Sequence, residues 1–311
     1  MSLITIVIPT FNRTELLTKT IESALNQSYN QLEIIVVDDN SDVLISDFIS
    51  KYISENKKEI FLIKTGGNKN GAYARNLGLR YSKGKHVCFI DDDDIIRQNF
   101  ISEHYKVCTQ NKYDMTACEH FRLINGRIYS ATNLRSNYRN YSLHLLNGDL
   151  SIPTSTLFFK KSFIKSLGGF DEKFTRHQDL ELLLRVFKST NAIGLINQKL
   201  TLMNIDGHRN YPNGSQAERI KTQFYMKFSS IISSFNYEEL KSINRYQYRG
   251  VACFYFRDKN FLRMVTICKK YIFGANPLNN ILEIIKILIM ASYRLRVILS
   301  IILNLWYYDR D

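Results

Sequence analysis

The first 95 residues alternate short apolar runs of strand length with segments whose apolar residues recur at helical spacing. Strands are predicted at 4–9, 32–37, 60–64 and 86–90, and helices at 14–27, 42–54 and 72–82. This alternation predicts a parallel sheet with helices on both of its faces. It constrains the fold more than any other feature, because few other architectures bury such runs.

Polar side chains follow three of these predicted strands directly. The first strand leads into Thr10 and Phe11, the second into Asp39, and the fourth into the run Asp91 to Asp94. In open α/β sheets, ligands bind outside the carboxyl ends of the strands. We therefore expect the three clusters to meet at one edge of the sheet and to form the functional site.

The run Asp91 to Asp94 is a candidate metal site. Carboxylate oxygens are hard ligands that suit Mg²⁺ or Mn²⁺, and such an ion can bridge two phosphates. Four adjacent carboxylates without basic neighbours would repel one another, which favours a bound cation. The alternative is a solvated acidic turn or a helix N-terminus, where carboxylates interact favourably with the helix dipole.

Phe11 and Asp39 suit a nucleotide base. An aromatic ring can stack on the base, and a carboxylate can accept the imide hydrogen of uracil. The alternatives are a core aromatic for Phe11 and a helix cap for Asp38 or Asp39.

The chain is less regular beyond residue 115. We predict a hairpin of strands 116–121 and 127–130 that turns at Asn125-Gly126, because this dipeptide favours tight turns. A strand at 156–160, helices at 161–167 and 179–188, and a polar loop at 206–215 follow. His208 in this loop is a further candidate metal ligand, and the alternative is an ordinary surface loop. We predict a catalytic domain at 1–215 and a basic helical region at 216–311.

The net charge of +13 is uneven along the chain. Residues 216–311 contain 15 Lys and Arg against 7 Asp and Glu, an excess of +8. A basic region of this kind attracts nucleic acid, anionic lipid or phosphorylated substrates, and composition alone does not choose among them.

Residues 281–308 are rich in Ile and Leu but are interrupted by charged residues, namely Glu283, Lys286, Arg294 and Arg296. The uncharged run 297–308 would span roughly 18 Å as a helix, which is short of the ~30 Å hydrocarbon core. We therefore predict a helix that lies in the plane of a membrane surface, with Trp306 to Tyr308 at headgroup level. A helix docked on the catalytic domain and a true membrane span are the alternatives.

The five cysteines are an odd set without close pairs, which indicates neither a disulfide framework nor a zinc site. The opening run Leu3 to Ile8 is too short for the apolar part of a secretory signal and lacks a basic start. We therefore expect a cytosolic protein.

Five segments in this order resemble glycosyltransferase family 2, the inverting enzymes of GT-A fold: Val7 to Arg13, Val36 to Ser41, Asn70 to Gly78, Phe89 to Ile95, and Gly169 to Glu172 followed by Gln178-Asp179. The likeness covers about residues 3–210 and is closest to bacterial O-antigen and capsule enzymes with a DxDD motif. It implies a Rossmann-like, nucleotide-binding mixed sheet flanked by helices.

The resemblance also implies roles for individual residues. Asp179 stands where the family has its catalytic base, although Gln178 departs from the usual Glu before it. Glu181 is a weaker candidate for the base. Asp93 and Asp91 would bind the metal. The residues implied to bind the nucleotide-sugar are Pro9, Thr10, Phe11, Asp39, Arg75, Asp91 and Asp92.

These roles imply an inverting transferase that uses Mn²⁺ or Mg²⁺. It would move glucose or galactose, with or without an N-acetyl group, from a UDP-sugar to an undecaprenyl-diphosphate-linked sugar in O-antigen synthesis, and would form a β-linkage. A capsule, teichoic acid or lipooligosaccharide acceptor is an alternative, and no nucleic-acid partner is expected. Alternatives of other classes are a nucleotidyltransferase, which would want a glycine- and lysine-rich phosphate loop, and a non-catalytic, basic membrane-binding protein.

Overall fold

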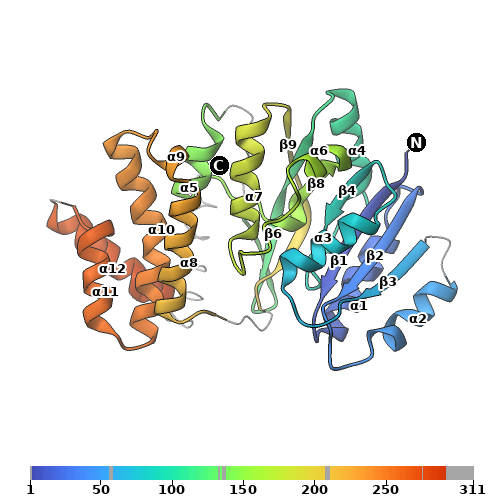
Figure 1. Cartoon of the computed structure of the whole chain (residues 1–311), viewed down its shortest axis with the longest axis horizontal. Coiled ribbons are helices and arrows are strands. Elements are labelled where there is room, and N and C mark those ends of the chain that lie inside the picture. Colours follow the sequence, from blue (N-terminus) through green and yellow to red (C-terminus); the bar gives the residue numbers. More distant parts are fainter. Residues whose placement is uncertain are drawn as a thin grey trace. The chain divides into compact units, whose positions relative to one another are not determined.

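The computed structural model describes residues 2–55, 59–131, 134, 138–206, 211–274 and 276–291. The chain divides into two compact units. The sheet unit comprises residues 1–139 and 151–208, and the helical unit comprises 140–150 and 209–311 (Figure 1).

The N-terminal part of the sheet unit has the predicted alternation of strands and helices. Its four strands are parallel and lie in the order β3-β2-β1-β4. The strands are β1 (Ile4–Thr10), β2 (Leu32–Asp38), β3 (Glu59–Lys64) and β4 (His86–Phe89). The helices between them are α1 (Thr14–Leu25), α2 (Ile45–Glu55) and α3 (Gly71–Tyr81). One detail of the prediction was wrong, because β1 continues through Pro9 to Thr10.

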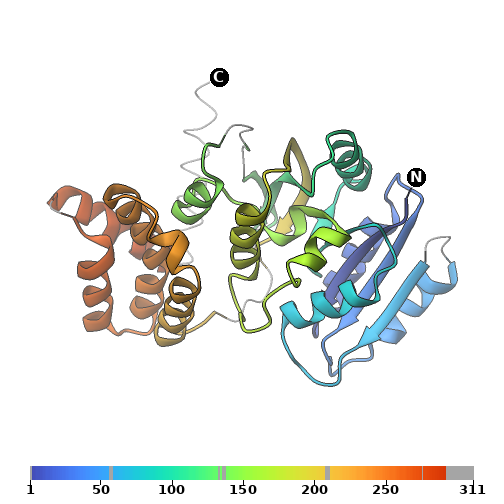
Figure 2. The ribbon, with the colours of Figure 1, turned by 45° about the horizontal axis from the view of Figure 1, so that its top comes forward.

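Both faces of these strands are covered, as Figures 1 and 2 show. Ile4, Ile6 and Ile8 of β1 share a fully buried core with Leu17 and Ile21 of α1. Residues alternate between the faces of a strand, so Val7 points the other way, toward α3. A Cβ at Gly78 of α3 would lie 2.3 Å from a methyl carbon of Val7. A glycine is therefore required where this helix crosses the sheet.

The rest of the sheet is mixed, as the GT-A resemblance implies. Strand β8 (Leu157–Lys160) pairs antiparallel with β4 and with β6 (Met115–Ile124). Strand β9 (Ile193–Asn204) runs parallel to β6 and pairs antiparallel with β5 (Ile95–Ile96). The predicted hairpin is confirmed, since β6 turns at Asn125 and Gly126 into β7 (Arg127–Ser130).

Several other elements complete the sheet unit. The helix α4 (Phe100–Gln110), like β5 and β9, was not predicted from the sequence. A short 3-10 turn, η1 (Thr154–Thr156), precedes β8. The helices α6 (Lys161–Ser166) and α7 (Gln178–Ser189) follow within a residue or two of their predicted positions.

The helical unit is built around α10 (Tyr237–Arg257), against which the other main helices pack. These helices are α5 (Tyr141–Asn147), α8 (Gly214–Lys227), α11 (Phe261–Ile267), the π-helical turn η2 (Cys268–Ile272) and α12 (Pro277–Ala291). The short helix α9 (Ser229–Ile232) packs against α8. Capping boxes formed by Asn213 and Asn236 begin α8 and α10. Among the residues that the structure describes, none of the helices is long and apolar enough to cross a membrane.

Candidate active site

The parallel register brings the ends of the first strands to one edge of the sheet. Thr10 of β1 lies opposite Asp38 of β2. The amide of Asp39 then donates a 2.8 Å hydrogen bond to the carbonyl of Thr10. Strand β4 ends one strand further along at Phe89, opposite Val7, so the aspartate run begins at the same edge. The three polar clusters that follow the predicted strands therefore lie side by side.

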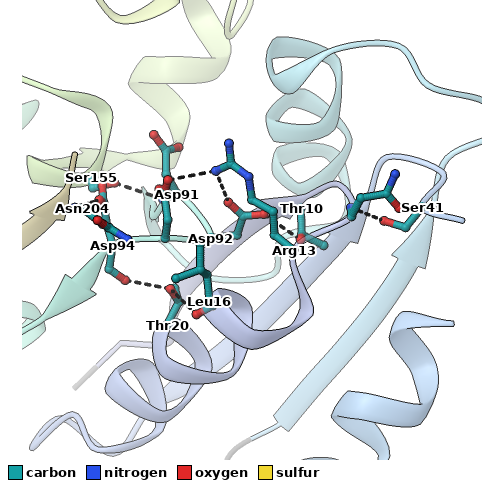
Figure 3. A network of polar contacts seen from close by, with 12 residues as sticks. Thr10, Arg13, Leu16, Thr20, Ser41, Asp91, Asp92, Asp94, Ser155 and Asn204 are labelled. Atoms are coloured by element: carbon teal, nitrogen blue, oxygen red, sulfur yellow. Dashed lines mark hydrogen bonds and ion pairs between the residues drawn. The ribbon is translucent and has the colours of Figure 1, made fainter. Parts of the chain in front are cut away.

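The four aspartates divide into two buried and two more accessible carboxylates. Asp92 accepts a 2.8 Å hydrogen bond from the hydroxyl of Thr10. Asp94 accepts one of 3.0 Å from the amide of Asn204, at the end of β9. Both residues are at most 5% exposed. The alternative of a solvated acidic turn is therefore wrong, because buried polar contacts hold the run in place (Figure 3).

Two arginines compensate the charge of the run. Arg13, at the start of α1, donates hydrogen bonds to Asp92 at 3.1 Å and to Asp93 at 2.9 Å. Arg75 of α3 is ion-paired with Asp91. The expectation of carboxylates without basic neighbours was therefore wrong. Arg13 was not predicted as a site residue, although it ends the first of the five family segments and lies three residues after the end of β1.

Burial controls protonation in the run. Burial raises the pKa of Asp92 to about 6, against the opposing charge of Arg13. Burial, followed by the charges of Asp91 and Asp93, also raises the pKa of Asp94 well above its usual range. One oxygen of Asp94, Oδ2, has no hydrogen-bond partner within the described part of the chain. These two residues hold the loop in position, which leaves Asp91 and Asp93 as the more accessible pair.

The donor set fits a divalent cation that is shared with a substrate. The side chain of Asp91 is 35% exposed and that of Asp93 is 13% exposed. Within the described ranges, no group of three or more His, Cys, Asp or Glu side chains is placed to hold a metal ion. Mg²⁺ needs no such cage, because it is often held by one or two carboxylates plus substrate phosphates. The third predicted ligand, His208, lies outside the described residues.

The residues predicted to bind the uracil ring of the nucleotide lie beside the aspartates. Asp39 is 6% exposed and accepts hydrogen bonds from the Thr65 hydroxyl at 3.1 Å and the Lys69 amide at 3.0 Å. Phe11 is 41% exposed, which is unusual for a phenylalanine at the edge of a core sheet. The exposure of Phe11 excludes a core aromatic. The carboxylate of Asp39 contacts the segment that follows β3, whereas Asp38, the other residue considered as a helix cap, accepts a hydrogen bond from the amide of Ser41. Pro9 is buried within β1.

Asp179, the predicted base, lies at the start of α7 and accepts a 2.8 Å hydrogen bond from the amide of Leu180. Burial and the charge of Asp91 raise its pKa. The rival Glu181 is fully buried and ion-paired with Arg185 at 2.6 Å, so it is not available to a substrate.

Arg75 connects Gln178, the residue before the predicted base Asp179, to the aspartate run. One of its terminal nitrogens bonds to Asp91, and the other donates a 2.7 Å hydrogen bond to the side-chain oxygen of Gln178. Gln178 also donates to the carbonyl of Phe174 at 2.8 Å. The start of α7 is thus tied to the end of β4 through a guanidinium that is only 10% exposed. Gln178 is neutral, so its contact with Arg75 is a hydrogen bond, and Arg75 forms its ion pair with Asp91.

Comparison with known proteins shows the family of the chain. The sequence model described as "Glycosyl transferase family 2" matches residues 5–167. The chain belongs to glycosyltransferase family 2. The match covers the four parallel strands, the aspartate run and β6 to β8.

Individual relatives give further detail. An Escherichia coli protein named "UDP-Glc:alpha-D-GlcNAc-diphosphoundecaprenol beta-1,3-glucosyltransferase WfaP" is 39% identical over 94 residues, which cover 30% of this chain and 36% of WfaP. The chain spans less than half the length of several curated relatives, and only 29% of a Rickettsia bellii glycosyltransferase.

Solved structures share the fold. Staphylococcus aureus TarS 1–349 in complex with UDP-GlcNAc has a TM-score of 0.63 at 16% identity, over 94% of this chain and 82% of that one. The mannosyltransferase PcManGT from Pyrobaculum calidifontis, in complex with GDP-Man and Mn²⁺, has a TM-score of 0.58 at 15% identity, over 100% of this chain and 88% of that one. At these identities the likeness concerns the fold alone.

Proposed function

We propose that the chain is an inverting glycosyltransferase that transfers a hexose from a UDP-sugar to a lipid-diphosphate-linked sugar. The observation that carries the proposal is the contact of Arg75 with both Asp91 and Gln178. It brings the predicted metal ligands and the predicted base into one site, next to the strand ends that carry Phe11 and Asp39.

The donor nucleotide would lie across the ends of β1 and β2. The exposed ring of Phe11 offers a face for the uracil, and Asp39 offers a carboxylate oxygen for the imide hydrogen. Thr65 and Lys69 already fix this carboxylate, so it is preorganised for binding. Arg75 and Arg13 lie on the side where the diphosphate would meet the aspartates.

Asp91 and Asp93 would hold Mn²⁺ or Mg²⁺ together with the diphosphate. The metal would supply a positive charge that stabilises the UDP leaving group. Arg13, which contacts Asp93 at 2.9 Å, contributes a second positive charge at the same place. Two guanidinium groups and one divalent cation would therefore offset much of the negative charge of the aspartates and the diphosphate.

Asp179 would remove the proton from the acceptor hydroxyl. Its raised pKa makes it a stronger base than an ordinary aspartate once it is ionised. The hydroxyl oxygen then attacks the anomeric carbon on the face opposite to UDP, so an α-linked donor gives a β-linked product. No covalent intermediate is required, because one base and one stabilised leaving group complete the displacement.

The proposed acceptor rests on the similarity to WfaP. WfaP, by its name, acts on a diphosphoundecaprenol-linked sugar, which supports a lipid-diphosphate acceptor for this chain. We place the enzyme in O-antigen or related surface polysaccharide synthesis, peripherally bound to the cytoplasmic face of the inner membrane. Glucose and galactose, with or without an N-acetyl group, are the proposed donor sugars. A capsule, teichoic acid or lipooligosaccharide acceptor is the alternative.

A donor screen tests the proposal. The protein and Mn²⁺ are incubated with UDP- and GDP-sugars and with a GlcNAc- or GalNAc-diphosphate-lipid analogue, and the anomeric configuration of the product is read by NMR. We expect transfer from a UDP-sugar with inversion. Transfer with retention would overturn the single-displacement mechanism. In a parallel incubation with nucleoside triphosphates in place of the nucleotide-sugars, release of pyrophosphate would instead favour a nucleotidyltransferase.

A further inference from the structure

The helix α12 has its apolar side turned outward. Leu278, Ile281, Leu282 and Ile285 recur at spacings of three and four, so they form one stripe along the helix. Their exposures are 70%, 53%, 53% and 44%. A helix at the surface of a globular unit normally shows the opposite pattern, with charged residues outward and leucines inward. Within the described part of the chain, the stripe is therefore an apolar face without a partner.

The inward side of α12 contains its acidic residue. Glu283 is 3% exposed and is ion-paired with Arg249 of α10 at 2.8 Å and with Lys286 at 2.9 Å. Ile287, one turn further, is 1% exposed and belongs to the core of the helical unit. Since a buried carboxylate that loses its partners is strongly destabilised, these ion pairs fix the rotation of α12.

Basic residues lie close to this face in the sequence. From residue 259 to residue 291 there are five Lys and Arg and one acidic residue, the buried Glu283. Lys269 and Lys270 are exposed on η2. The side chain of Asn280 bonds the amide and carbonyl of Gly274 at 2.8 and 2.9 Å, which ties the end of η2 to the start of α12.

The helix α11 adds to the same pattern. Phe261, Leu262 and Val265 lie on one side of it with exposures of 53%, 83% and 38%. The opposite side buries Ile267 in the core that also contains Ile287. Both α11 and α12 pack against α10, as the red and orange helices of Figure 1 show.

We propose that the apolar stripe of α12, together with the adjoining Lys269 and Lys270, is a docking face for a bilayer of anionic phospholipid. Leucine and isoleucine side chains would enter the acyl boundary while the lysines pair with phosphate headgroups. This inference rests on the proposed function in one respect, because a lipid-linked acceptor has to be reached at a membrane. The face itself is defined by exposure and charge alone.

The occupant is argued from charge. A second copy of this chain would bring the same basic residues to the interface, where like charges repel. An anionic bilayer complements both the apolar stripe and the excess of lysine. Vesicle binding is therefore the discriminating measurement, and it needs neither donor nor acceptor.

The experiment compares the full chain with matched variants by co-sedimentation. Vesicles of phosphatidylcholine are used with and without phosphatidylglycerol. Leu278→Gln/Leu282→Gln removes the two leucines of the stripe and keeps a good helix former at both positions. Leu44→Gln/Met226→Gln is the control, since these residues are 64% and 72% exposed elsewhere. Lys269→Gln/Lys270→Gln tests the charge.

We expect the wild type and the control pair to bind phosphatidylglycerol vesicles equally. The stripe variant should bind about tenfold more weakly or worse, and the lysine variant should lose the preference for phosphatidylglycerol. Equal binding by the stripe variant overturns the proposal. A stripe variant that changes from dimer to monomer also overturns it, because a second copy would then cover the face. A stripe variant whose thermal midpoint falls does the same, because residues 292–311 would then cover it. Failed sugar transfer with normal vesicle binding would count against the proposed function only.

Discussion

Lys221 of α8 gives a prediction whose size follows from the structure. Its side chain is 3% exposed, and its ammonium group donates a 2.6 Å hydrogen bond to Gln247 of α10. Gln247 in turn donates to the carbonyl of Leu146. Burial lowers the pKa of Lys221 from 10.5 to about 7. The folded protein therefore releases a proton that the unfolded chain keeps.

The sign follows from proton linkage. Between about pH 7 and 10.5 the unfolded chain binds more protons at this site, so stability rises with pH. With ~1.4 kcal/mol per pKa unit, this site costs the fold about 4 kcal/mol at about pH 7 and about 1 kcal/mol at about pH 9.5. The wild type should therefore gain about 3 kcal/mol from this group over that interval.

Replacing Lys221 by Met removes this pH dependence. It also leaves the Gln247 oxygen without its donor, which costs about 1–3 kcal/mol. At about pH 7, Lys221→Met should therefore be more stable than the wild type by about 1–3 kcal/mol, and the difference should reverse by about pH 9.5. Lys227→Met, on the exposed side of the same helix, should stay within about 0.5 kcal/mol of the wild type at both pH values.

The assay is urea unfolding of the full chain, followed by far-UV circular dichroism at both pH values. Because two compact units can unfold separately, the helical signal is fitted with two transitions where the data require them. A Lys221→Met variant whose stability relative to the wild type is the same at both pH values would refute the reasoning.

Other predictions concern the site. Asp179→Asn should lower kcat by ~10²–10⁴ with UDP affinity retained. Because burial raises the pKa of Asp179, the wild-type rate should rise with pH through that pKa. A kcat/KM that does not change with pH would contradict this. Gln178→Glu places a carboxylate against Arg75 and should move that rising limb to higher pH. Glu181→Gln breaks a buried pair with Arg185 and should cost about 3–5 kcal/mol in urea unfolding while kcat of the folded enzyme is kept. Chelation by EDTA should abolish transfer without changing the circular dichroism, and added Mn²⁺ or Mg²⁺ should restore it.

Most of the parallel half of the sheet could be predicted from the sequence, because β1, β2 and β4 are buried along their whole length. Their runs are mostly apolar and lead into polar residues, whereas the edge strand β3 is only partly buried. Strand β9 escaped notice because Asn197 to Lys199 interrupt its pattern, at the point where its register with β6 shifts. The helix α4 could not be predicted from the sequence for another reason. His104 stands in its buried stripe between Phe100 and Cys108 and looks polar in sequence.

The site could be predicted in outline only. Residues that directly follow strands β1, β2 and β4 were placed together by the rule for parallel sheets. The contacts that hold them come from distant elements, such as Ser155 to Asp91 and Asn204 to Asp94, and no local pattern reports such pairs. The position of Asp179 came from the family resemblance, since its link through Gln178 to Arg75 joins residues 103 apart.

The most direct test of the shared site is calorimetric titration of UDP into the wild type, Asp39→Asn and Asp93→Asn, each with and without Mn²⁺. We expect the wild type to bind one UDP per chain, and more tightly with Mn²⁺. Asp39→Asn should weaken binding under both conditions, and Asp93→Asn should remove only the gain from Mn²⁺. UDP binding that ignores both substitutions, or that does not respond to Mn²⁺ in the wild type, would contradict a uridine diphosphate site at this edge of the sheet.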